Sequence, residues 1–310
     1  MQLQKPPFIF CRGAVRPQEE AVLHVSAEAV VRGLNVFEGL KGYWQPDGRF
    51  GIVALPRHHA RLRRSARLMR LPFDMDLPAF EEACHAIAAA LAEPDRDMWV
   101  RATLYGTEGH WGVDTRSDLV LTAYHQPKAP PEPWPTGVSA WRRADDNALP
   151  ARIKTSANYF VARMAKIEGR DRGYTEMILL NGAGRVAEFV GSCLVMARDG
   201  VLVTPPAWEG ALESITVDIV EALARDMGIP FVRRPVERSE LLVADEIAAV
   251  GTLVEVTPVL SVDGLPLPTP RLLTALRDRY RDAVTGADPH PAVDLSIQSV
   301  GRRVPAMAAE

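Results

Sequence analysis

The stretch ARIKTSANYFVARMAKIEG, residues 151–169, places a lysine in an unusual setting. The chain contains five lysines among many arginines, and Lys154 is the one closely bracketed by Ile153, small polar residues and the Asn158–Tyr159 pair. Arginine is essentially always charged, whereas a desolvated lysine can lose its proton and attack a carbonyl group. Lys154 is therefore either incidental or the amine that a site requires.

The composition is that of an ordinary globular chain, with 310 residues, 47% hydrophobic and 24% charged. This length allows one large domain or two unequal ones, and either can bury a substantial core. A formal net charge of -3 argues against broad nucleic-acid binding, which normally shows as a basic face. The arginine-rich stretch RLRRSARLMR (61–70) is interpreted as the polar face of a helix.

Cysteine usage and hydropathy predict a cytoplasmic chain with no membrane segment. Cys11, Cys84 and Cys193 are odd in number and lack metal-ligand spacing, which favours a reducing compartment over a disulfide framework. The N-terminal stretch lacks the basic region and long apolar core of a signal peptide, and no run approaches the roughly 18 apolar residues of a membrane span. The scattered histidines and the carboxylates show no spacing that indicates a metal site.

Hydrophobic periodicity alternates between strand-like and helical segments, which predicts an α/β or α+β fold. In the first part of the chain, a hairpin turn is expected at Pro46-Asp47-Gly48. Two later strands are expected to bracket a glycine-containing loop, TEGHWGVDTRS (107–117). The expected segments are a strand at 7–13, the hairpin at 39–55, helices at 57–70 and 77–92, and strands at 99–106 and 118–125.

The densest proline stretch, QPKAPPEPWPTG (126–137), is predicted to be an extended linker, because proline removes backbone donors and stiffens the chain. It would join a small N-terminal α/β domain, residues 1–125, to a larger C-terminal domain, residues 138–310. The tail from about residue 285 is weakly patterned. After the linker we expect helices at 157–172, 215–227, 238–242 and 270–283, and strands at 138–142, 175–181, 193–198, 201–206, 231–234, 246–252 and 254–264.

Separated segments present groups suited to holding an anionic, aromatic aldehyde. Lys154 offers an amine, and Glu188 follows a glycine-punctuated turn and could face a cationic ring nitrogen. The helix that starts at Ser214-Ile215-Thr216 offers backbone N–H groups and its dipole to a phosphate. Thr252 adds a hydroxyl at a strand end, and Arg61 could form a charged hydrogen bond to the same phosphate. Taken singly, each signal is weak.

The arrangement resembles the fold-type IV (class IV) pyridoxal-phosphate enzymes, and most closely the branched-chain aminotransferases. The resemblance runs from about residue 20 to about residue 264, and the series ADE…GT…E-x-TPV…DG, together with VFEG and K-x-x-x-N-Y, is specific. It implies a two-lobed α/β fold similar to D-amino acid aminotransferase, with pyridoxal 5'-phosphate as cofactor. The stretches that carry it are RGLNVFEGLKGYW (32–44), RHHARLRRSARLMRLP (57–72), VRATLYGTEGHWGV (100–113), IKTSANYFVA (153–162), NGAGRVAE (181–188), LVTPP (202–206), LESITVDIVEALARDMGI (212–229) and LLVADEIAAVGTLVEVTPVLSVDG (241–264).

The resemblance also implies a role for each matching position. Lys154 looks like the lysine that forms the Schiff base, Tyr159 like the neighbour of the ring oxygen, and Glu188 like the partner of the protonated ring nitrogen. The remaining implied positions are the phosphate contacts Arg61, Ile215, Thr216 and Thr252, the turn Thr252-Leu253 for the substrate carboxylate, and the pocket residues Phe37, Trp99 and Arg101. The loop at 110–113 would reach a neighbouring subunit, so a homodimer or higher homo-oligomer is implied.

Several substrate-wall positions depart from the family pattern. Arg32 stands where a tyrosine usually precedes the Gly-x-x-Val-Phe-Glu-Gly segment, and Leu253 stands where many members have a small residue. Arg32 either binds a second anionic or polar group of the substrate or pairs with Glu38 or another acid. Further departures are Trp99 for a tyrosine, Cys193-Leu194-Val195 for Asn-x-Phe, and Glu213-Ser214-Ile215-Thr216-Val217 for Pro-Gly-Ile-Thr-Arg.

Three functions are compatible with these residues. The first is a transaminase that moves an amino group from an L-amino acid, branched-chain-like or more polar, to a 2-oxo acid such as 2-oxoglutarate. The second keeps the fold and cofactor but acts as an aminodeoxychorismate lyase or a D-amino acid aminotransferase; YGTEGHWGV (105–113) favours the first. The third is a non-catalytic binding protein, against which Lys154, Tyr159 and Glu188 argue together.

Overall fold

The computed structural model describes residues 5–298, which form two compact units. Unit 1 contains the described residues up to Lys128, residues 284–289 and the described residues from Val293 onward. Unit 2 contains residues 129–283 and 290–292. Residues 284–289 and 293–298 thus belong to the unit formed by the N-terminal third, which the weak sequence pattern there did not indicate.

Unit 1 is built on an antiparallel sheet. Within the described residues it has seven strands, in the order β16-β4-β3-β5-β6-β1-β2. The predicted hairpin is present, with its turn at residues 45–49 between β3 and β4. The unexpected strand β16 pairs with β4 and closes one edge. The strands are β1 (Phe8–Cys11), β2 (Ala14–Pro17), β3 (Asn35–Trp44), β4 (Phe50–Val53), β5 (Asp97–His110), β6 (Val113–Gln126) and β16 (Leu295–Gln298).

The loop expected at residues 107–117 is mostly strand. β5 and β6 pair from Asp97↔Gln126 to His110↔Val113, so the connection is reduced to Trp111 and Gly112. Gly109 and Gly112 have positive φ, and the register shifts on both sides of Glu108, so irregular backbone is accommodated inside a continuing hairpin. The expectation of a loop was wrong because bulges preserve strand pairing despite the glycines.

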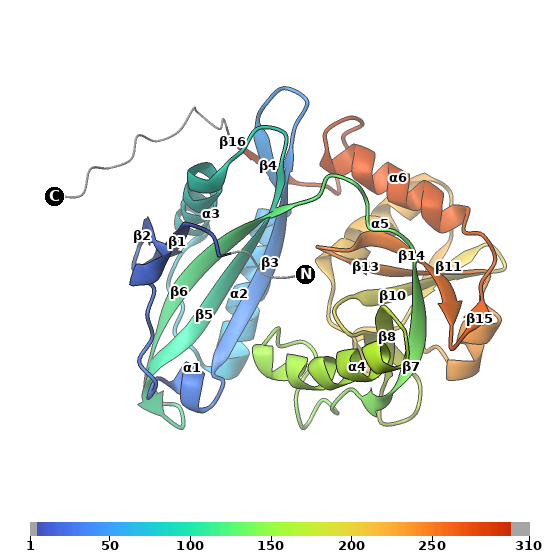
Figure 1. Ribbon diagram of the computed structural model, residues 1–310, viewed down its shortest axis with the longest axis horizontal. Helices are drawn as coiled ribbons and strands as arrows, with labels where there is room; N and C mark the ends of the chain where they lie inside the picture. Colours follow the sequence, from blue (N-terminus) through green and yellow to red (C-terminus); the bar gives the residue numbers. More distant parts are fainter. Residues whose placement is uncertain (1–4, 299–310) are drawn as a thin grey trace. The chain divides into compact units, whose positions relative to one another are not determined.

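Helices cover one face of this sheet (Figure 1). α2 (Leu55–Met69) packs on β3, and α3 (Leu77–Leu91) packs on β1 and β6. Asp76 caps α3 by accepting a hydrogen bond from the Ala79 backbone at 3.0 Å. Two short helical segments, η1 (Gln18–Glu20) and α1 (Glu28–Val31), precede β3 and were not expected from the sequence.

Unit 2 contains the second sheet, in the order β12-β11-β10-β13-β14-β7-β8-β9, with β15 added beside β14. β7 begins at Trp134, inside the stretch expected to be a linker, because Trp134 and Thr136 pair with Val259 and Val262. The strands are β7 (Trp134–Arg142), β8 (Glu176–Leu180), β9 (Val186–Phe189), β10 (Cys193–Arg198), β11 (Val201–Thr204), β12 (Phe231–Arg233), β13 (Glu246–Gly251), β14 (Glu255–Val262) and β15 (Leu265–Pro266).

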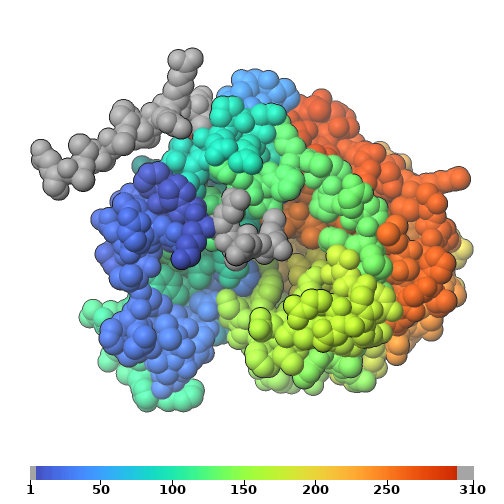
Figure 2. Space-filling view, in the orientation of Figure 1, coloured from blue at the N-terminus to red at the C-terminus, as the bar shows by residue number. Residues whose placement is uncertain are grey.

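The helices of unit 2 match the expected positions. α4 (Tyr159–Asp171) follows the one-turn η2 (Ser156–Asn158) and packs on β7 and β8, while α5 (Ile215–Asp226) packs on β12 and β13. Figure 2 shows α4, in yellow-green, at the surface of this unit. The remaining helical segments are η3 (Ala207–Glu209), η4 (Arg238–Leu242) and α6 (Leu272–Val284). Helices and strands are thus mixed in both units, as the sequence predicts.

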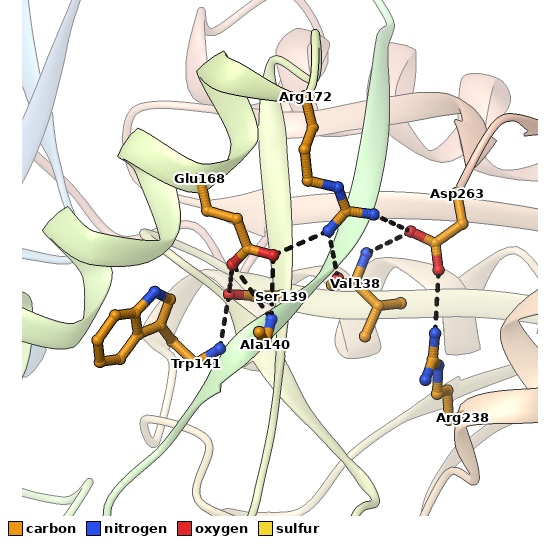
Figure 3. Close-up of polar contacts among 8 residues, drawn as sticks. All are labelled: Val138, Ser139, Ala140, Trp141, Glu168, Arg172, Arg238 and Asp263. Carbon is orange, nitrogen blue, oxygen red and sulfur yellow. Dashed lines mark hydrogen bonds and ion pairs between the residues drawn. The ribbon is translucent and has the colours of Figure 1, made fainter.

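A surface network of charged residues ties α4 to the end of β14 (Figure 3). Glu168 on α4 accepts a 2.6 Å hydrogen bond from the Ser139 hydroxyl on β7. Arg172 bridges Glu168 at 2.9 Å and Asp263 at 3.2 Å, and Asp263 also pairs with Arg238 at 3.3 Å. The network therefore fixes the C-terminal end of the helix whose first residue is Tyr159.

Within residues 5–298 we find no helix long and apolar enough to cross a membrane. The three cysteines are all buried thiols without a disulfide. The described part of the chain also contains no cluster of three or more His, Cys, Asp or Glu side chains that could hold a metal ion.

Candidate active site

Lys154 lies in the segment between β7 and η2, and its side chain reaches Tyr159, the first residue of α4. Its Nζ atom is 3.4 Å from the Tyr159 hydroxyl and 5.9 Å from the centre of the Tyr159 ring. The Asn158 side chain donates to the Ile153 carbonyl at 3.1 Å, and Ile153 is buried. The backbone on both sides of Lys154 is therefore fixed, and the amine and the phenol lie together.

Glu188 lies on β9 and is buried beside a buried arginine. Its Oε1 atom is 3.3 Å from Nε of Arg143, and its Oε2 atom accepts a 3.0 Å hydrogen bond from the Leu212 backbone. Burial raises the pKa of Glu188, while the charges of Arg143 and Lys154 and the Leu212 hydrogen bond partly oppose the rise. The carboxyl group is thus held in place, but its neighbours offset only part of the cost of burying its negative charge.

The N-terminus of α5 and the turn after β13 provide backbone donors in the same unit. Ser214 caps α5, its hydroxyl accepting a 3.2 Å hydrogen bond from the Val217 backbone, and Ile215 and Thr216 are buried in the first turn. Thr252 and Leu253 lie half-buried in the three-residue turn between β13 and β14. The structure therefore places Ile215, Thr216 and Thr252 at a helix N-terminus and a tight turn, where backbone N–H groups can bind anions.

Ser192 adds a buried hydroxyl that the sequence did not single out. It lies between β9 and β10, and a Cβ built on Gly251 would lie 3.2 Å from the Cβ of Ser192. Its Oγ atom is buried and has no hydrogen-bond partner among the residues that the structure describes. Buried polar atoms are normally hydrogen-bonded, so this hydroxyl beside the turn at Gly251 is a potential donor to a bound anion.

Unit 1 contains a second buried carboxylate, Glu38 on β3, which faces α2. Arg61 donates to both of its oxygens at 2.7 Å through Nε and Nη2, and His58 Nδ1 lies 2.7 Å from Oε2. Burial alone would raise the pKa of Glu38, but the Arg61 charge and the hydrogen bonds from Arg61 and His58 lower it to about 2. The bidentate contact fixes the Arg61 guanidinium on the helix face.

Three predicted substrate residues share the opposite face of the unit 1 sheet. Phe37 on β3 pairs with Thr103 on β5. Thr103, Arg101 and Trp99 are every second residue of β5, so their side chains project to the same side as Phe37. The Arg101 guanidinium carbon lies 3.9 Å from the Phe37 ring centre, and the Trp99 indole lies over Gly39. The structure therefore brings Phe37 and Arg101 into contact and places Trp99 on the neighbouring position of that face.

Arg32 lies apart from these three residues, at the end of α1. It forms an ion pair with Glu28, four residues earlier, and its guanidinium carbon lies 4.8 Å from the Trp111 ring centre at the hairpin tip. Arg101 is roughly 30 Å away from that tip along β5. Of the two expected partners, Arg32 thus pairs with another acid rather than with Glu38, whose oxygens are occupied by Arg61 and His58.

Comparison with known proteins identifies the relatives of this chain. Residues 35–262 match the model of the Amino-transferase class IV family. The chain is 32% identical over 276 residues to the branched-chain-amino-acid aminotransferase of Escherichia coli (strain K12), covering 86% of this chain and 88% of that protein. It is 30% identical over 287 residues to a probable branched-chain-amino-acid aminotransferase of Synechocystis sp., covering 90% and 92% respectively.

The structural comparison agrees. The crystal structure of the branched-chain amino acid aminotransferase from Thermobaculum terrenum in its PLP-form matches with a TM-score of 0.86 at 30% identity, covering 96% of this chain and 99% of that one. Fold and site together define a pyridoxal-phosphate-dependent aminotransferase. The chain belongs to the class IV aminotransferase family. The family, the fold class and the cofactor expected from the sequence are confirmed.

The residues of unit 2 fit this cofactor chemically. Lys154 supplies an amine for an aldehyde, Glu188 a buried anion for a ring nitrogen, and the α5 N-terminus donors for a phosphate. The buried Ser192 hydroxyl, which has no hydrogen-bond partner within residues 5–298, is a further donor beside the turn that contains Thr252. This donor set matches the three polar parts of pyridoxal phosphate.

Sequence reasoning missed Arg143, His58 as a partner of Glu38, and Ser192. Arg143 directly follows β7, as the second residue of the doublet Arg142-Arg143. The only sequence signal for Arg143 was a charged residue at the end of a buried strand. The two arginines cannot be distinguished in sequence, although Arg142 is exposed and the Arg143 side chain is 8% exposed.

Proposed function

We propose that this aminotransferase moves the amino group of an L-amino acid, branched-chain-like or a more polar analogue, to a 2-oxo acid such as 2-oxoglutarate, with ping-pong kinetics. The observation that carries the proposal is the grouping of Lys154, Tyr159 and Glu188 in one unit, within a chain whose relatives are named for branched-chain substrates. The named relatives do not favour the lyase-like or D-specific alternatives.

When bound, the cofactor supplies an aldehyde that accepts the amino group and a ring that takes up electron density. Lys154 serves as the amine that holds the aldehyde carbon and as the base that moves the substrate α-proton. Tyr159, whose hydroxyl lies 3.4 Å from that amine, would orient it and would hold the ring oxygen of the bound cofactor. Glu188 keeps the ring nitrogen protonated, because a buried anion favours a neighbouring cation.

We assign substrate recognition to the Phe37, Trp99 and Arg101 face and to the backbone of Thr252-Leu253. Phe37 and Trp99 offer apolar surface to a branched side chain, and Arg101, stacked on Phe37, offers charge to a more polar one. The phosphate roles of Arg61, Ile215, Thr216 and Thr252 belong to the same proposal. Arg32 pairs with Glu28 and lies over the Trp111 ring at the hairpin tip. We therefore expect Arg32 to affect substrate specificity only if the tip reaches the active site of a neighbouring subunit.

We further propose a homodimer located in the cytoplasm. Trp111 and Val113 at the hairpin tip are 77% and 64% exposed, and Val30 and Val31 on the neighbouring α1 are 53% and 57% exposed. Exposed apolar patches of this kind mark protein interfaces. Light scattering after gel filtration should give twice the chain mass of 34.0 kDa for the wild type and the monomer mass for Trp111→Asp. The buried free cysteines support a reducing compartment.

The decisive experiment measures glutamate formed from 2-oxoglutarate with a panel of L- and D-amino acids. The wild type should use an L-donor, and Lys154→Ala should lower the rate by roughly a thousandfold or more. Lys166→Ala is the matched control, because Lys166 lies on α4 and pairs with Glu176 at 2.8 Å, and it should retain activity. A rate unaffected by Lys154→Ala, or turnover of D-donors only, would contradict the proposal.

A further inference from the structure

We propose that Arg143 is a positioning residue for Glu188, holding that carboxylate ionised and oriented so that the proton stays on the cofactor's ring nitrogen. The proposal rests on the proposed function, since it assigns Glu188 to that nitrogen. It adds a residue to the site that the family motifs in the sequence did not indicate.

The guanidinium of Arg143 is fixed before any ligand binds. The Arg143 backbone donates to the Leu180 carbonyl at 2.9 Å, which places the residue beside the end of β8. Its Nε atom also donates to the Gly210 carbonyl at 3.1 Å, while the same atom lies 3.3 Å from Glu188 Oε1. Both side chains are nearly buried, with 8% and 10% exposed. A fixed cation therefore faces one oxygen of Glu188 from within the unit.

The environment of Glu188 makes this cation necessary. Burial raises the pKa of Glu188, and the Arg143 charge is the largest of the opposing influences. The second oxygen receives the Leu212 backbone donor at 3.0 Å and a long contact from the Cys193 thiol at 3.9 Å. Without Arg143 the largest influence opposing burial would be lost and the pKa of Glu188 would rise further, which favours the neutral acid, and a neutral acid cannot stabilise a positively charged ring nitrogen.

A purely structural role for Arg143 is the alternative, because its Nε also supports the loop at Gly210. The chain contains a matched control for that role. Arg185 forms a bidentate pair, at 2.7 and 2.9 Å, with Glu209, which is the residue immediately before Gly210. Removing Arg185 loosens the same loop but leaves the Arg143–Glu188 contact in place.

The test compares Arg143→Gln, Arg143→Lys and Arg185→Gln, each reconstituted with pyridoxal phosphate labelled with ¹⁵N in the ring. In Arg143→Gln the ring-nitrogen signal should move toward the unprotonated position at neutral pH. Its kcat should fall roughly 10- to 100-fold with KM changed little. Arg143→Lys should recover most of both readouts, and Arg185→Gln should leave the nitrogen signal unchanged while lowering the unfolding temperature.

Infrared difference spectra of the apoproteins provide a readout that needs no turnover. Arg143→Gln should show a protonated-carboxyl band at neutral pH that disappears in the Arg143→Gln, Glu188→Gln double variant. Absence of that band, together with a nitrogen that stays protonated, would overturn the proposal even if Arg143→Gln is unstable or slow. A wild type that binds no pyridoxal phosphate would instead refute the proposed function, and the apoprotein band would still test the Arg143–Glu188 coupling. Should Arg143→Gln not fold, Arg143→Lys is the test: because a cation still faces Glu188 there, an unprotonated ring nitrogen together with an ionised carboxylate in that variant would overturn the proposal.

Discussion

Glu38 in unit 1 and Glu188 in unit 2 are both buried beside an arginine, yet their pKa values shift in opposite directions. Glu38 receives two 2.7 Å hydrogen bonds from Arg61 and a 2.7 Å contact from His58, and its pKa falls to about 2. Glu188 receives one 3.3 Å contact from Arg143 and one backbone donor, and burial raises its pKa. The number and geometry of the donors decide the sign.

The difference separates a carboxylate whose charge is neutralised by its own partners from one whose charge is only partly neutralised. The negative charge of Glu38 is neutralised by Arg61 of the same unit, and this ion pair joins β3 to α2. Glu188 remains under-compensated, so a further cation, such as a protonated ring nitrogen, would be bound favourably beside it. Groups with perturbed pKa values are frequent at active sites, and structural ion pairs also perturb them, so the only partly neutralised charge of Glu188 is the distinguishing feature.

Glu38→Gln should produce the largest effect on stability. The change leaves the buried Arg61 guanidinium facing a neutral amide, and breaking a buried ion pair by removing one partner costs about 3–5 kcal/mol. Urea unfolding of the wild type and the variant measures this loss. Glu93→Gln, which removes an exposed pair with Arg96, is the control and should change the unfolding free energy by less than about 1 kcal/mol. A small loss for Glu38→Gln would erase the contrast with Glu188.

The pH dependence of stability should carry opposite signs for the two glutamates. Because the pKa of Glu38 is lowered from 4.5 to about 2, its contribution is fully present above pH 4.5 and is lost as the pH falls toward 2. That loss amounts to about 3 kcal/mol. It is measured as the difference in unfolding free energy between wild type and Glu38→Gln along an acid titration, and a difference constant with pH would contradict it.

Glu188 should behave in the reverse way in the apoprotein. Its pKa is raised above the ordinary value of 4.5, so its contribution is present below that value and is lost as the pH rises through the folded-state pKa. The comparison of wild type with Glu188→Gln should therefore show a difference that declines with rising pH, the opposite slope to Glu38.

Glu188→Gln should lower kcat by roughly a hundredfold, equivalent to about 2.7 kcal/mol. An amide can accept a hydrogen bond but carries no charge, so it no longer favours a protonated ring nitrogen. Steady-state kinetics with the best L-donor measure the loss, and far-ultraviolet circular dichroism verifies the fold. A variant with wild-type kcat would show that the raised pKa of Glu188 has no catalytic consequence.

Arg172→Ala should have the smallest effect, below about 1 kcal/mol in unfolding free energy. Arg172 is the centre of the surface network in Figure 3, but its side chain is 40% exposed and solvent screens its contacts with Glu168 and Asp263. Thermal unfolding at low and high salt measures the effect. A loss as large as that of Glu38→Gln would mean that exposure does not distinguish structural ion pairs in this chain.

Much of the fold could be predicted from local patterns. Helices such as α2 and α5 carry regular apolar spacing with start and stop signals, so their bounds agree with expectation within two residues. Strands without such signals were missed: β16 is four residues long and is held mainly by pairing with β4. The loop expected around Gly109 failed for the same reason, because pairing of β5 with β6 prevailed over local glycine content.

The residues of the candidate site were proposed from the sequence one by one, but the electrostatics around them could not be. Lys154, Tyr159 and Glu188 stand in motifs that resemble those of the family. Arg143 and Ser192 stand in no motif, and only folding brings them beside Glu188 and Gly251. The two possible partners of Arg32 also became distinguishable only when Glu38 was found bound to Arg61.

The sequence by itself determined the family, the cofactor chemistry and most of the longer helices and strands, because motifs and periodicity are properties of neighbouring residues. The tertiary structure decided which buried charge is compensated. Glu38 and Glu188 are the same residue type, each on a buried stretch of strand, and nothing local distinguishes their pKa values. Desolvation and the distance to a cation depend on chain segments far apart in sequence, and only the folded chain sets both.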